Sequence, residues 1–305
     1  MEIMYLGEAV RQQRKRLGLT LEMVCEGLCT IMTLSRFEKG KQTPSRDCVG
    51  AILQRLGMPG DQYCAQLTDA EAQLLRLRTE INAYCGQFEQ TLGEEQQQAR
   101  KSALEKLRDL ERCVKENDRI NQQFILGVRA TLEPYRPQEQ LEMLMKAIRL
   151  TSPRFDSEKI SNCLYCATEV VIINKIAIRY FFCEQREKAL DIYEQLLKLI
   201  LKRDPNHDCL HLITYNYALY LAEEKRWKEA LEISALGREV CIKQGNYNTL
   251  PGFLHIEAES YYFMGESSRS ISLHRSAYHL YGAIMDTRNQ EVLKTDAKER
   301  FNLTL

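Results

Sequence analysis

Two small groups of residues have the types and spacing for metal or redox chemistry. Cys163 and Cys166 form a CxxC pair, and His207 and His211 lie four residues apart. A zinc site needs a second ligand pair at finger-like spacing, and a redox CxxC normally follows a strand; the sequence has neither around these residues. It also has no HExxH, Walker-type phosphate loop, GxSxG or GxGxxG motif. We therefore predict that the protein is not an enzyme and needs no cofactor or metal. The alternative is a metal or redox role for the CxxC pair.

The elements that position any functional residue should all be helices. Of the 305 residues, 44% are hydrophobic, and apolar residues recur every three or four positions almost throughout. No apolar run approaches the roughly 20 residues needed to cross a bilayer, and the N-terminus has no signal-peptide pattern. The eleven cysteines, an odd number, are spread through helical patterns, which favours reduced thiols. The sequence predicts an all-α cytoplasmic protein that does not associate with a membrane.

The first sixty residues predict two short helices in close succession. Residues 6–17 should form a first helix, with Leu17 among its inward-facing side chains. Thr20 can cap a second helix, and Thr30 can cap a third over residues 31–37, with only about two residues between the second and the third. Two short helices this close must cross steeply, which describes a helix-turn-helix.

Three stretches of sequence carry a family pattern over residues 5–58. They are LGEAVRQQRKRLGLT, SRFEKGKQTPS and an apolar run that ends in LGM. In order and spacing they resemble the lambda-repressor-like, or XRE-type, DNA-binding domain. In that family the second helix of the pair enters the major groove by its N-terminal residues. The resemblance implies base contacts from Thr30, Ile31, Met32, Thr33 and Arg36, and phosphate contacts from Arg14, Thr20 and Lys39.

Arg36 is the best candidate to read a base, because a guanidinium can bind guanine bidentately. Thr33, Ile31 and Met32 could pack on thymine methyl groups. Leu21 departs from the family, in which a glutamine commonly follows the threonine and helps to hold the DNA backbone. Residues 1–60 contain nine Lys and Arg against six Asp and Glu, a mild positive excess in a chain whose charges balance. The alternative is a small helical bundle whose basic residues are only solvated.

Composition divides the chain into three parts. Glycine and proline at residues 57–60 end the first domain, which we place at residues 1–64. Residues 65–120 are polar, rich in Gln and Glu and divided near Gly93, and they predict linker helices at the start of a solenoid. Residues 121–305 predict the repeat domain.

The last part of the chain repeats itself with a period of 41 and then 40 residues. Small residues mark the middle of one predicted helix and the start of the next in three consecutive copies: Ala177 and Ala189, Ala218 and Ala230, Ala258 and Ser270. Small residues there let paired helices approach closely, so we expect helix hairpins stacked into a tetratricopeptide-like (TPR-like) α-solenoid. An earlier and looser copy covers residues 121–150.

The first helix of each pair should line a concave surface of the solenoid. The lining positions mix carboxamide, apolar and ionisable side chains: Asn174, Ile178 and Phe181, then Asn216, Leu219 and Ala222, then His255, Glu259 and Tyr262. A carboxamide can hydrogen-bond both the N–H and the C=O of an extended peptide, while apolar neighbours form pockets for its side chains. The alternative for each asparagine is a polar residue that faces water.

Two further stretches follow the helix-turn-helix, LTSPRFD at 150–156 and EVVIINKIAIRY at 169–180. With the XRE-type domain before them, they resemble the RNPP peptide-pheromone receptors of Gram-positive bacteria, a PlcR-like group to which the Rgg regulators are related. The resemblance covers nearly the whole chain. It implies that the repeat domain binds a short signalling peptide whose backbone is held by Asn174 and Asn216. Arg129, on the looser copy, could hold a peptide carboxylate, with an ordinary surface arginine as the alternative.

Together these patterns predict a quorum-sensing transcription regulator. It should bind double-stranded operator DNA and respond to a short signalling peptide in the groove of the repeat domain. We also expect a homodimer, because one helix-turn-helix reads only a few base pairs and two held about one DNA turn apart multiply specificity. The alternative is a TPR adaptor that grips a partner protein and whose DNA binding is secondary or lost.

Overall fold

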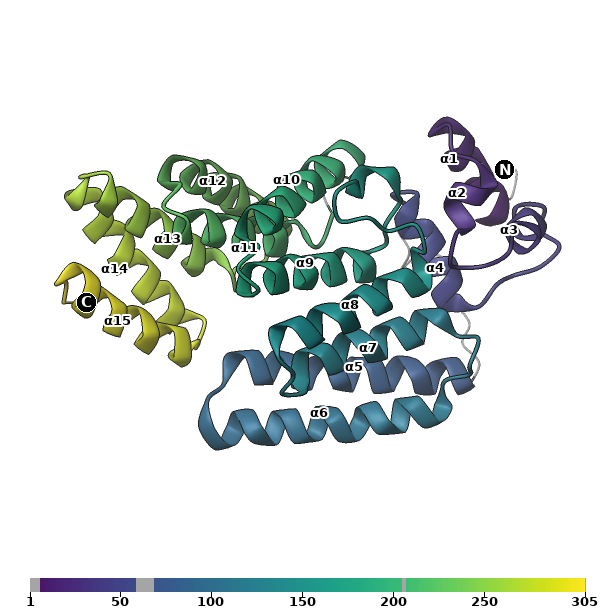
Figure 1. Ribbon diagram of the computed structural model, residues 1–305, viewed down its shortest axis with the longest axis horizontal. Coiled ribbons are helices and arrows are strands. Elements are labelled where there is room, and N and C mark those ends of the chain that lie inside the picture. Colours follow the sequence, from purple (N-terminus) through teal and green to yellow (C-terminus); the bar gives the residue numbers. More distant parts are fainter. Residues whose placement is uncertain (1–5, 59–68, 205–206, 305) are drawn as a thin grey trace. The chain divides into compact units, whose positions relative to one another are not determined.

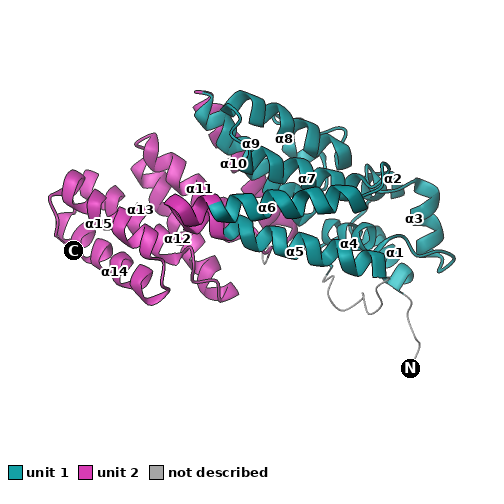
Figure 2. Ribbon diagram, turned by 90° about the horizontal axis from the view of Figure 1, so that it is seen from below, with its two compact units in different colours: residues 1–86, 98–183 teal, residues 87–97, 184–305 magenta. Residues whose placement is uncertain are grey.

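The computed structural model describes residues 6–58, 69–204 and 207–304, and every regular element in these ranges is helical. The expectation of an all-α fold is therefore confirmed. Over the same ranges, no helix is long and apolar enough to cross a membrane. The chain divides into two compact units (Figure 2): residues 1–86 with 98–183 form unit 1, and residues 87–97 with 184–305 form unit 2.

Unit 1 starts with four short helices, and longer helices follow (Figure 1). The short helices are α1 (Leu6–Arg16), α2 (Leu21–Cys25), α3 (Ile31–Glu38) and α4 (Arg46–Arg55). The longer ones are α5 (Asp69–Gln90), α6 (Gly93–Cys113), α7 (Arg119–Leu132), α8 (Pro137–Thr151) and α9 (Ala167–Phe182), with the 3-10 turn η2 (Ile160–Asn162) before α9. The connection from α5 to α6, with the helix ends that flank it, belongs to unit 2.

Local capping signals fix the starts of α2 and α3. The Thr20 hydroxyl accepts a hydrogen bond from the Met23 N–H at 3.2 Å, and the Thr30 hydroxyl accepts one from the Thr33 N–H at 3.1 Å. Each bond satisfies one of the N–H groups that a helix start leaves without an intrahelical partner. Both caps were predicted from the sequence and are confirmed.

Two details of this segment were predicted wrongly. Leu17 lies beyond the end of α1 and is 47% exposed, so it does not face inward. The helix α2 ends at Cys25, so that five residues, not about two, separate it from α3. Gly27 in this turn has φ of 69°, and a Cβ on it would lie 1.9 Å from the Thr151 carbonyl oxygen. The turn is thus shaped by its contact with the end of α8, which no local pattern signals.

The core of the four short helices extends into later parts of unit 1. Its most buried side chains include Val10, Val24, Leu34 and Ile52, all fully buried. Leu164, from the segment before α9, belongs to the same cluster, so the N-terminal helices share a core with later helices instead of closing on themselves.

The polar stretch after the first domain forms a helix pair. As predicted, it divides at Gly93, where α6 begins; the expected boundary at residues 64 and 65 lies outside the described residues. Glu80 of α5 and Lys106 of α6 form an ion pair at 2.6 Å, and Ile81 and Leu107 are buried. These helices therefore have a packed face of their own.

Unit 2 contains the helices of the periodic segment. They are α10 (Arg186–Arg203), α11 (Leu210–Glu223), α12 (Trp227–Gln244), α13 (Leu250–Phe263), α14 (Ser267–Ala283) and α15 (Thr287–Phe301). The helices pack in sequence-adjacent pairs, α11 on α12 and α13 on α14, as do α7 and α8 in unit 1. The five alanines of the repeat pattern are fully buried and Ser270 is 2% exposed. Trp227, at the start of α12, stacks on Phe263 with ring centroids 4.6 Å apart.

A left-handed residue follows the first helix of each repeat. Glu184, Lys225 and Gly265 have φ of 60°, 59° and 86°, and they are separated by the same 41 and 40 residues as the alanines. Only the third is glycine, the residue that adopts this conformation without steric cost. The turn conformation is therefore a property of the repeat. In the first two copies it occurs at Glu184 and Lys225, whose Cβ atoms disfavour it.

We expect opposite effects from exchanging these turn residues. Gly265→Ala should destabilise the protein by about 1–2 kcal/mol, because a Cβ is unfavourable in the left-handed region. Lys225→Gly should stabilise it by about 0.5 kcal/mol, since relief of the strain exceeds the added entropy of the unfolded chain. Urea unfolding followed by circular dichroism measures both. Two shifts of the same sign would show that turn conformation does not limit stability.

Candidate nucleic-acid interface and predicted peptide site

Helix α3 buries one face and exposes the other. Leu34 and Phe37 enter the core, whereas Ile31 is 50% exposed and Met32 is 62% exposed. Arg36 and Lys39 are also exposed. The exposed side of this region therefore carries two large apolar side chains at the N-terminal end of α3 and two cations farther along. Such a surface suits a DNA groove that offers both methyl groups and polar base edges.

Of the three threonines in the predicted interface, Thr20 and Thr30 are helix caps and Thr33 contacts Thr30. The Thr30 and Thr33 hydroxyl oxygens lie 2.9 Å apart, and both Thr20 and Thr30 are exposed cap residues. A capping hydroxyl accepts from the backbone and keeps its own proton, which it can donate to a phosphate oxygen. Thr20 thus remains available for its predicted phosphate contact while it fixes the start of α2, whereas the Thr30 hydroxyl is also hydrogen-bonded to that of Thr33.

Arg14 has internal partners in place of the expected phosphate. Its guanidinium donates to the two carboxylate oxygens of Glu38 at 2.6 and 2.8 Å and to the Leu19 carbonyl at 2.9 Å. The hydrogen bonds that Arg14 donates to Glu38 raise the pKa of Arg14, and the pair joins α1 to the end of α3. The Arg14 guanidinium, which was predicted to contact a phosphate, therefore already has an anionic partner within the domain. Its neighbours Lys15 and Arg16 are exposed, and sequence reasoning had not assigned them a role.

A buried ion pair links the four N-terminal helices to α9. Arg55, at the end of α4, places its Nη2 2.8 Å from Glu169 Oε1, and the two side chains are 2% and 0% exposed. The same guanidinium donates to the carbonyls of Val24 at 3.1 Å, Glu26 at 2.7 Å and Thr151 at 3.0 Å. Arg55 therefore contacts the end of α2, the turn that leads to α3, and the end of α8. No local sequence pattern signals this pair, whose members are 114 residues apart.

Hydrogen bonds from four groups hold the Glu169 carboxylate as an anion. Besides Arg55, the hydroxyls of Thr151 and Ser152 donate to Oε1 at 2.7 Å, and the Cys166 N–H donates to Oε2 at 2.7 Å. Burial alone raises the pKa of Glu169, but the Arg55 charge and these donors outweigh it, so the pKa lies below its usual range. Both partners are charged in the folded protein.

Polar contacts beside the buried ion pair also hold the N-terminal helices against the later part of unit 1. Arg154 binds Glu26 of the α2–α3 turn at 2.5 Å, and the Gln54 side chain accepts from the Ala167 N–H at 3.1 Å. These contacts surround the buried ion pair and connect the N-terminal helices with the segment between α8 and α9.

The side chains of unit 1 that were predicted to bind a peptide are buried, half-buried or already paired with another side chain. Asn174 is 3% exposed, so the alternative of a residue facing water is wrong for it. Phe181 is 7% exposed and Ile178 is half-buried. Arg129 binds Glu111 of α6 and lies 3.6 Å from Glu133, so its guanidinium already has carboxylate partners.

The predicted residues of unit 2 fall into two groups. On α11, Asn216 and Leu219 are half-buried. On α13, three positions expected to line an open groove meet α15 instead: His255 lies 3.3 Å from Asp296, Glu259 binds Arg300, and Tyr262 packs on Phe301 with ring centroids 4.8 Å apart. The repeat pattern did not reveal α15 as a partner for them, because that helix lacks the alanine signature.

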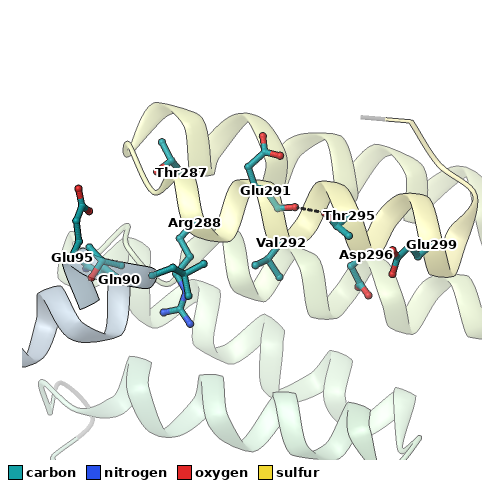
Figure 3. Close-up of a pocket in the computed structure, with 11 residues that line it drawn as sticks. Gln90, Glu95, Thr287, Arg288, Glu291, Val292, Thr295, Asp296 and Glu299 are labelled. Carbon is teal, nitrogen blue, oxygen red and sulfur yellow. Dashed lines mark hydrogen bonds between the residues drawn. The ribbon is translucent and has the colours of Figure 1, made fainter. Parts of the chain in front are cut away.

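A pocket of about 660 Å³ lies between the α5–α6 connection and α15 (Figure 3). Its lining carries four carboxylates, from Glu95, Glu291, Asp296 and Glu299, and one cation, Arg288. None of the residues predicted to bind a peptide lines this pocket.

The CxxC cysteines occupy structural positions. Cys163 and Cys166 are free thiols and are 7% and 6% exposed. Burial raises the pKa of both, and Cys166 is the cap residue of α9. Among the residues that the structure describes, no three His, Cys, Asp or Glu side chains are arranged to hold a metal.

A comparison with known protein families agrees with the helix-turn-helix geometry of the N-terminal helices. Residues 5–63 match the family model described as a helix-turn-helix domain. These residues are a helix-turn-helix domain. No curated protein sequence matches the chain. The match confirms the interpretation of the N-terminal segment.

Solved structures share the fold of nearly the whole chain. Bacillus thuringiensis PlcR in complex with the peptide PapR7 and DNA is 18% identical, with a TM-score of 0.60, over 95% of this chain and 98% of that chain. ComR from S. thermophilus, in complex with DNA and its signalling peptide ComS, is 15% identical, with a TM-score of 0.52, over 95% and 97%. The apo form of ComR from Streptococcus vestibularis is 17% identical, with a TM-score of 0.51, over 95% and 96%. The predicted fold, a helix-turn-helix domain followed by TPR-like repeats as in PlcR, is confirmed.

We expect Glu169→Gln to destabilise unit 1 by about 3–5 kcal/mol, because it leaves the buried Arg55 charge without its counter-ion. Thermal unfolding followed by circular dichroism measures the change, with the exposed Glu105→Gln as the matched control. The folded-state pKa of Glu169 lies below the unfolded value of about 4.3. The contribution of the ion pair to the free energy of unfolding should therefore be complete above about pH 4.3 and decline as the pH falls through the folded-state pKa of Glu169. A loss no larger than that of the control would contradict the role of the pair.

For Arg36→Ala we expect a loss of about 1–3 kcal/mol in binding to the preferred DNA sequence, with relaxed choice at one base pair. Lys39→Ala should instead weaken binding by a similar factor on all sequences, since a phosphate contact carries no sequence information. Fluorescence anisotropy on the preferred duplex and on single-base variants separates the two effects. An unchanged site preference in Arg36→Ala would refute base reading by this residue.

Proposed function

We propose that the protein is a peptide-responsive transcription regulator, which binds operator DNA as a homodimer and is switched by a short signalling peptide. The observation that carries the proposal is a fold shared over 95% of the chain with PlcR, whose structure was solved with both a peptide and DNA. The exposed face of α3 supports the DNA half independently, because it presents Ile31, Met32 and Arg36 outward.

In this proposal, the N-terminal end of α3 reads bases in the major groove. Arg36 binds guanine, while Ile31 and Met32 pack on thymine methyl groups. Thr33 adds a contact at the groove, and Thr30 donates from the cap of α3. The phosphate contacts come from Thr20 and Lys39, and from Lys15 and Arg16, whose exposed positions take the place of Arg14.

The peptide half of the proposal rests on the asparagines. In unit 1, Asn174 holds the peptide backbone and Ile178 and Phe181 form pockets for its side chains; in unit 2, Asn216 and Leu219 have the corresponding roles. Because Asn174 is 3% exposed, a peptide reaches it only when neighbouring side chains move. Binding is therefore linked to a conformational change, and the peptide favours the state in which it makes the better contacts.

The remaining predicted contacts depend on displacement of other side chains. Arg129 must leave Glu111 before it can bind a peptide carboxylate. His255, Glu259 and Tyr262 join the binding surface only when α15 separates from them. We propose these four residues as secondary contacts.

Helix α9 connects the two halves of the proposal. Its first turn carries Glu169, which holds Arg55 of the helix-turn-helix domain, and its middle carries Asn174. A helix is rigid over such a distance, so a peptide that moves Asn174 also moves the counter-ion of Arg55. We infer that this shared helix transmits the peptide signal to the DNA-binding domain.

The adaptor alternative gains no support from Leu21. This residue, which departs from the helix-turn-helix pattern, packs against the core of α1–α4. Its identity thus has a structural reason that does not imply loss of DNA binding.

A two-step experiment tests the proposal. Selection from random duplexes with the full chain yields its preferred DNA, and fluorescence anisotropy then measures affinity with and without synthetic peptides encoded by short reading frames beside its gene. One peptide should change the DNA affinity by about 5–150-fold, the usual range of coupling between sites, and the preferred DNA should be an inverted repeat. DNA binding that is indifferent to every peptide would contradict the sensing half.

Asparagine variants provide the matched controls for that experiment. Asn174→Ala and Asn216→Ala should lose the peptide response and keep the affinity for DNA, whereas Asn162→Ala, an exposed residue of η2, should behave as the unmodified protein. Sedimentation velocity on each complex determines whether two chains bind one duplex. A normal peptide response in both groove variants would refute the assignment of the asparagines.

A further inference from the structure

One face of helix α15 packs on α13 and α14. Leu293, Ala297 and Phe301, spaced by four residues along α15, are all buried. The centroid of the Phe301 ring lies 4.8 Å from that of Tyr262 in α13 and 4.8 Å from that of His274 in α14. Helix α15 therefore packs an aromatic ring directly on a histidine of the neighbouring helix.

His274 is buried in its neutral form. The side chain is 0% exposed, and its Nδ1 lies 3.0 Å from the Ser270 carbonyl oxygen. A carbonyl can only accept, so Nδ1 carries the proton. Among the residues that the structure describes, His274 Nε2 has no hydrogen-bond partner. A second proton, on Nε2, would place a charge in a buried site without an acceptor. Burial accordingly lowers the pKa of His274 to about 4.

The charged groups around His274 do not compensate for its burial. On α13, the ring centroid of His255 lies 5.5 Å away, and a charge on His255 opposes a second one on His274. On α15, Asp296 favours the protonated form of His274 and Arg300 disfavours it, and these two side chains are paired with each other at 3.2 Å. The docked arrangement of the three helices therefore favours a neutral His274.

We propose that His274 makes the docking of α15 sensitive to pH: mild acidification protonates the imidazole, and α15 leaves α13 and α14 because only the undocked state lets water solvate the added charge.

Two contacts of α15 act in the opposite direction and limit the effect. His255 Nε2 lies 3.3 Å from Asp296 Oδ2, so protonation of His255 strengthens that contact. Both side chains are 23% exposed, and a pair that is partly solvated gains little. Burial raises the pKa of Glu259 in spite of its ion pair with Arg300, so protonation of Glu259 also favours the docked state. The release therefore depends on His274, the most deeply buried of the three acid-sensitive groups.

The direction and size of the effect follow from the two environments of the imidazole. The pKa of His274 is about 4 when α15 is docked, and a histidine in water has a pKa of about 6.5. Its contribution to docking is thus complete above about pH 6.5 and is lost as the pH falls toward 4. Between pH 7.5 and 5.0, His274 alone should raise the undocked fraction about 30-fold. With the opposing contacts we expect about tenfold.

Undocking would uncover part of the proposed peptide-binding surface. His255, Glu259 and Tyr262, which we propose as secondary peptide contacts, all meet α15 in the docked state. Mild acid would therefore raise the fraction of protein that is competent to bind through these residues, and apparent affinity rises with that fraction. This consequence rests on the proposed function; the release of α15 does not.

Hydrogen exchange followed by mass spectrometry tests the release without a peptide or DNA. The full chain is labelled at pH 7.5 and at pH 5.0, and the rates are corrected for the intrinsic pH dependence of exchange. We expect α15 to exchange about tenfold faster at pH 5.0, with α11 and α12 unchanged. His279→Gln, which removes an exposed histidine of α14, should behave as the unmodified protein, whereas His274→Leu should show no acceleration.

A second variant, His274→Gln, keeps a polar side chain without a titratable group and replaces His274→Leu if circular dichroism shows that leucine impairs folding. Three results would overturn the proposal. They are the absence of acceleration in the unmodified protein, equal acceleration in the unmodified protein and a folded His274 variant, and faster exchange spread evenly over α11–α15.

Peptide titration tests the consequence. The probe is the synthetic peptide that changes DNA affinity in the anisotropy experiment. Its half-saturating concentration should be about tenfold lower at pH 5.0 than at pH 7.5 for the unmodified protein, and unchanged for His274→Leu. The same pH dependence in both proteins would overturn the regulatory part. If no peptide changed the DNA affinity, the proposed function would fail while hydrogen exchange still decided the release of α15.

Discussion

The arrangement of unit 1 depends on the buried ion pair between Arg55 and Glu169. Removing two charges from water costs several kcal/mol for each ion, and attraction between them offsets that cost only when hydrogen bonds satisfy the remaining polar atoms. Here the hydroxyls of Thr151 and Ser152 and the Cys166 N–H complete the carboxylate, and backbone carbonyls complete most of the guanidinium. Neither charge can stay buried without the other. The end of α4 and the start of α9 are therefore held together by electrostatic necessity more than by apolar area.

The same guanidinium also sets the path of the chain toward α3. The carbonyls of Val24 and Glu26, at the end of a five-residue helix, have no intrahelical partner, and Arg55 supplies the donors. Next to them, Gly27 lies so close to Thr151 that only a residue without a Cβ fits. The turn before α3 is consequently built on the end of α8. In this protein the orientation of α3, the helix proposed to face DNA, is not an internal property of the helix-turn-helix domain.

This dependence explains which features the sequence could predict. The caps at Thr20 and Thr30, the break at Gly93 and the 41 and 40 residue repeat are encoded within a few residues or one period, and all are confirmed. The length of the α2–α3 turn was predicted wrongly because it is fixed by α8, more than a hundred residues away. Likewise Arg14, placed at a basic helix end, has its guanidinium bound to Glu38. A single sequence shows that a cation is present but not which anion the fold brings to it, and so the Arg55–Glu169 pair was missed entirely.

A buried ion pair also determines how a signal can pass through α9. Apolar surfaces that slide by an ångström lose little energy, whereas a partly separated ion pair in a water-excluded site leaves both charges uncompensated. Intermediate positions of α9 relative to Arg55 are therefore unfavourable, and the contact favours two arrangements, one closed and one fully solvated. Packed interfaces with two discrete arrangements are what convert small shifts at a ligand site into large ones elsewhere. In the proposed regulator, a displacement of Asn174 by a peptide would be transmitted as an all-or-none release of Arg55, and with it of the turn that aims α3.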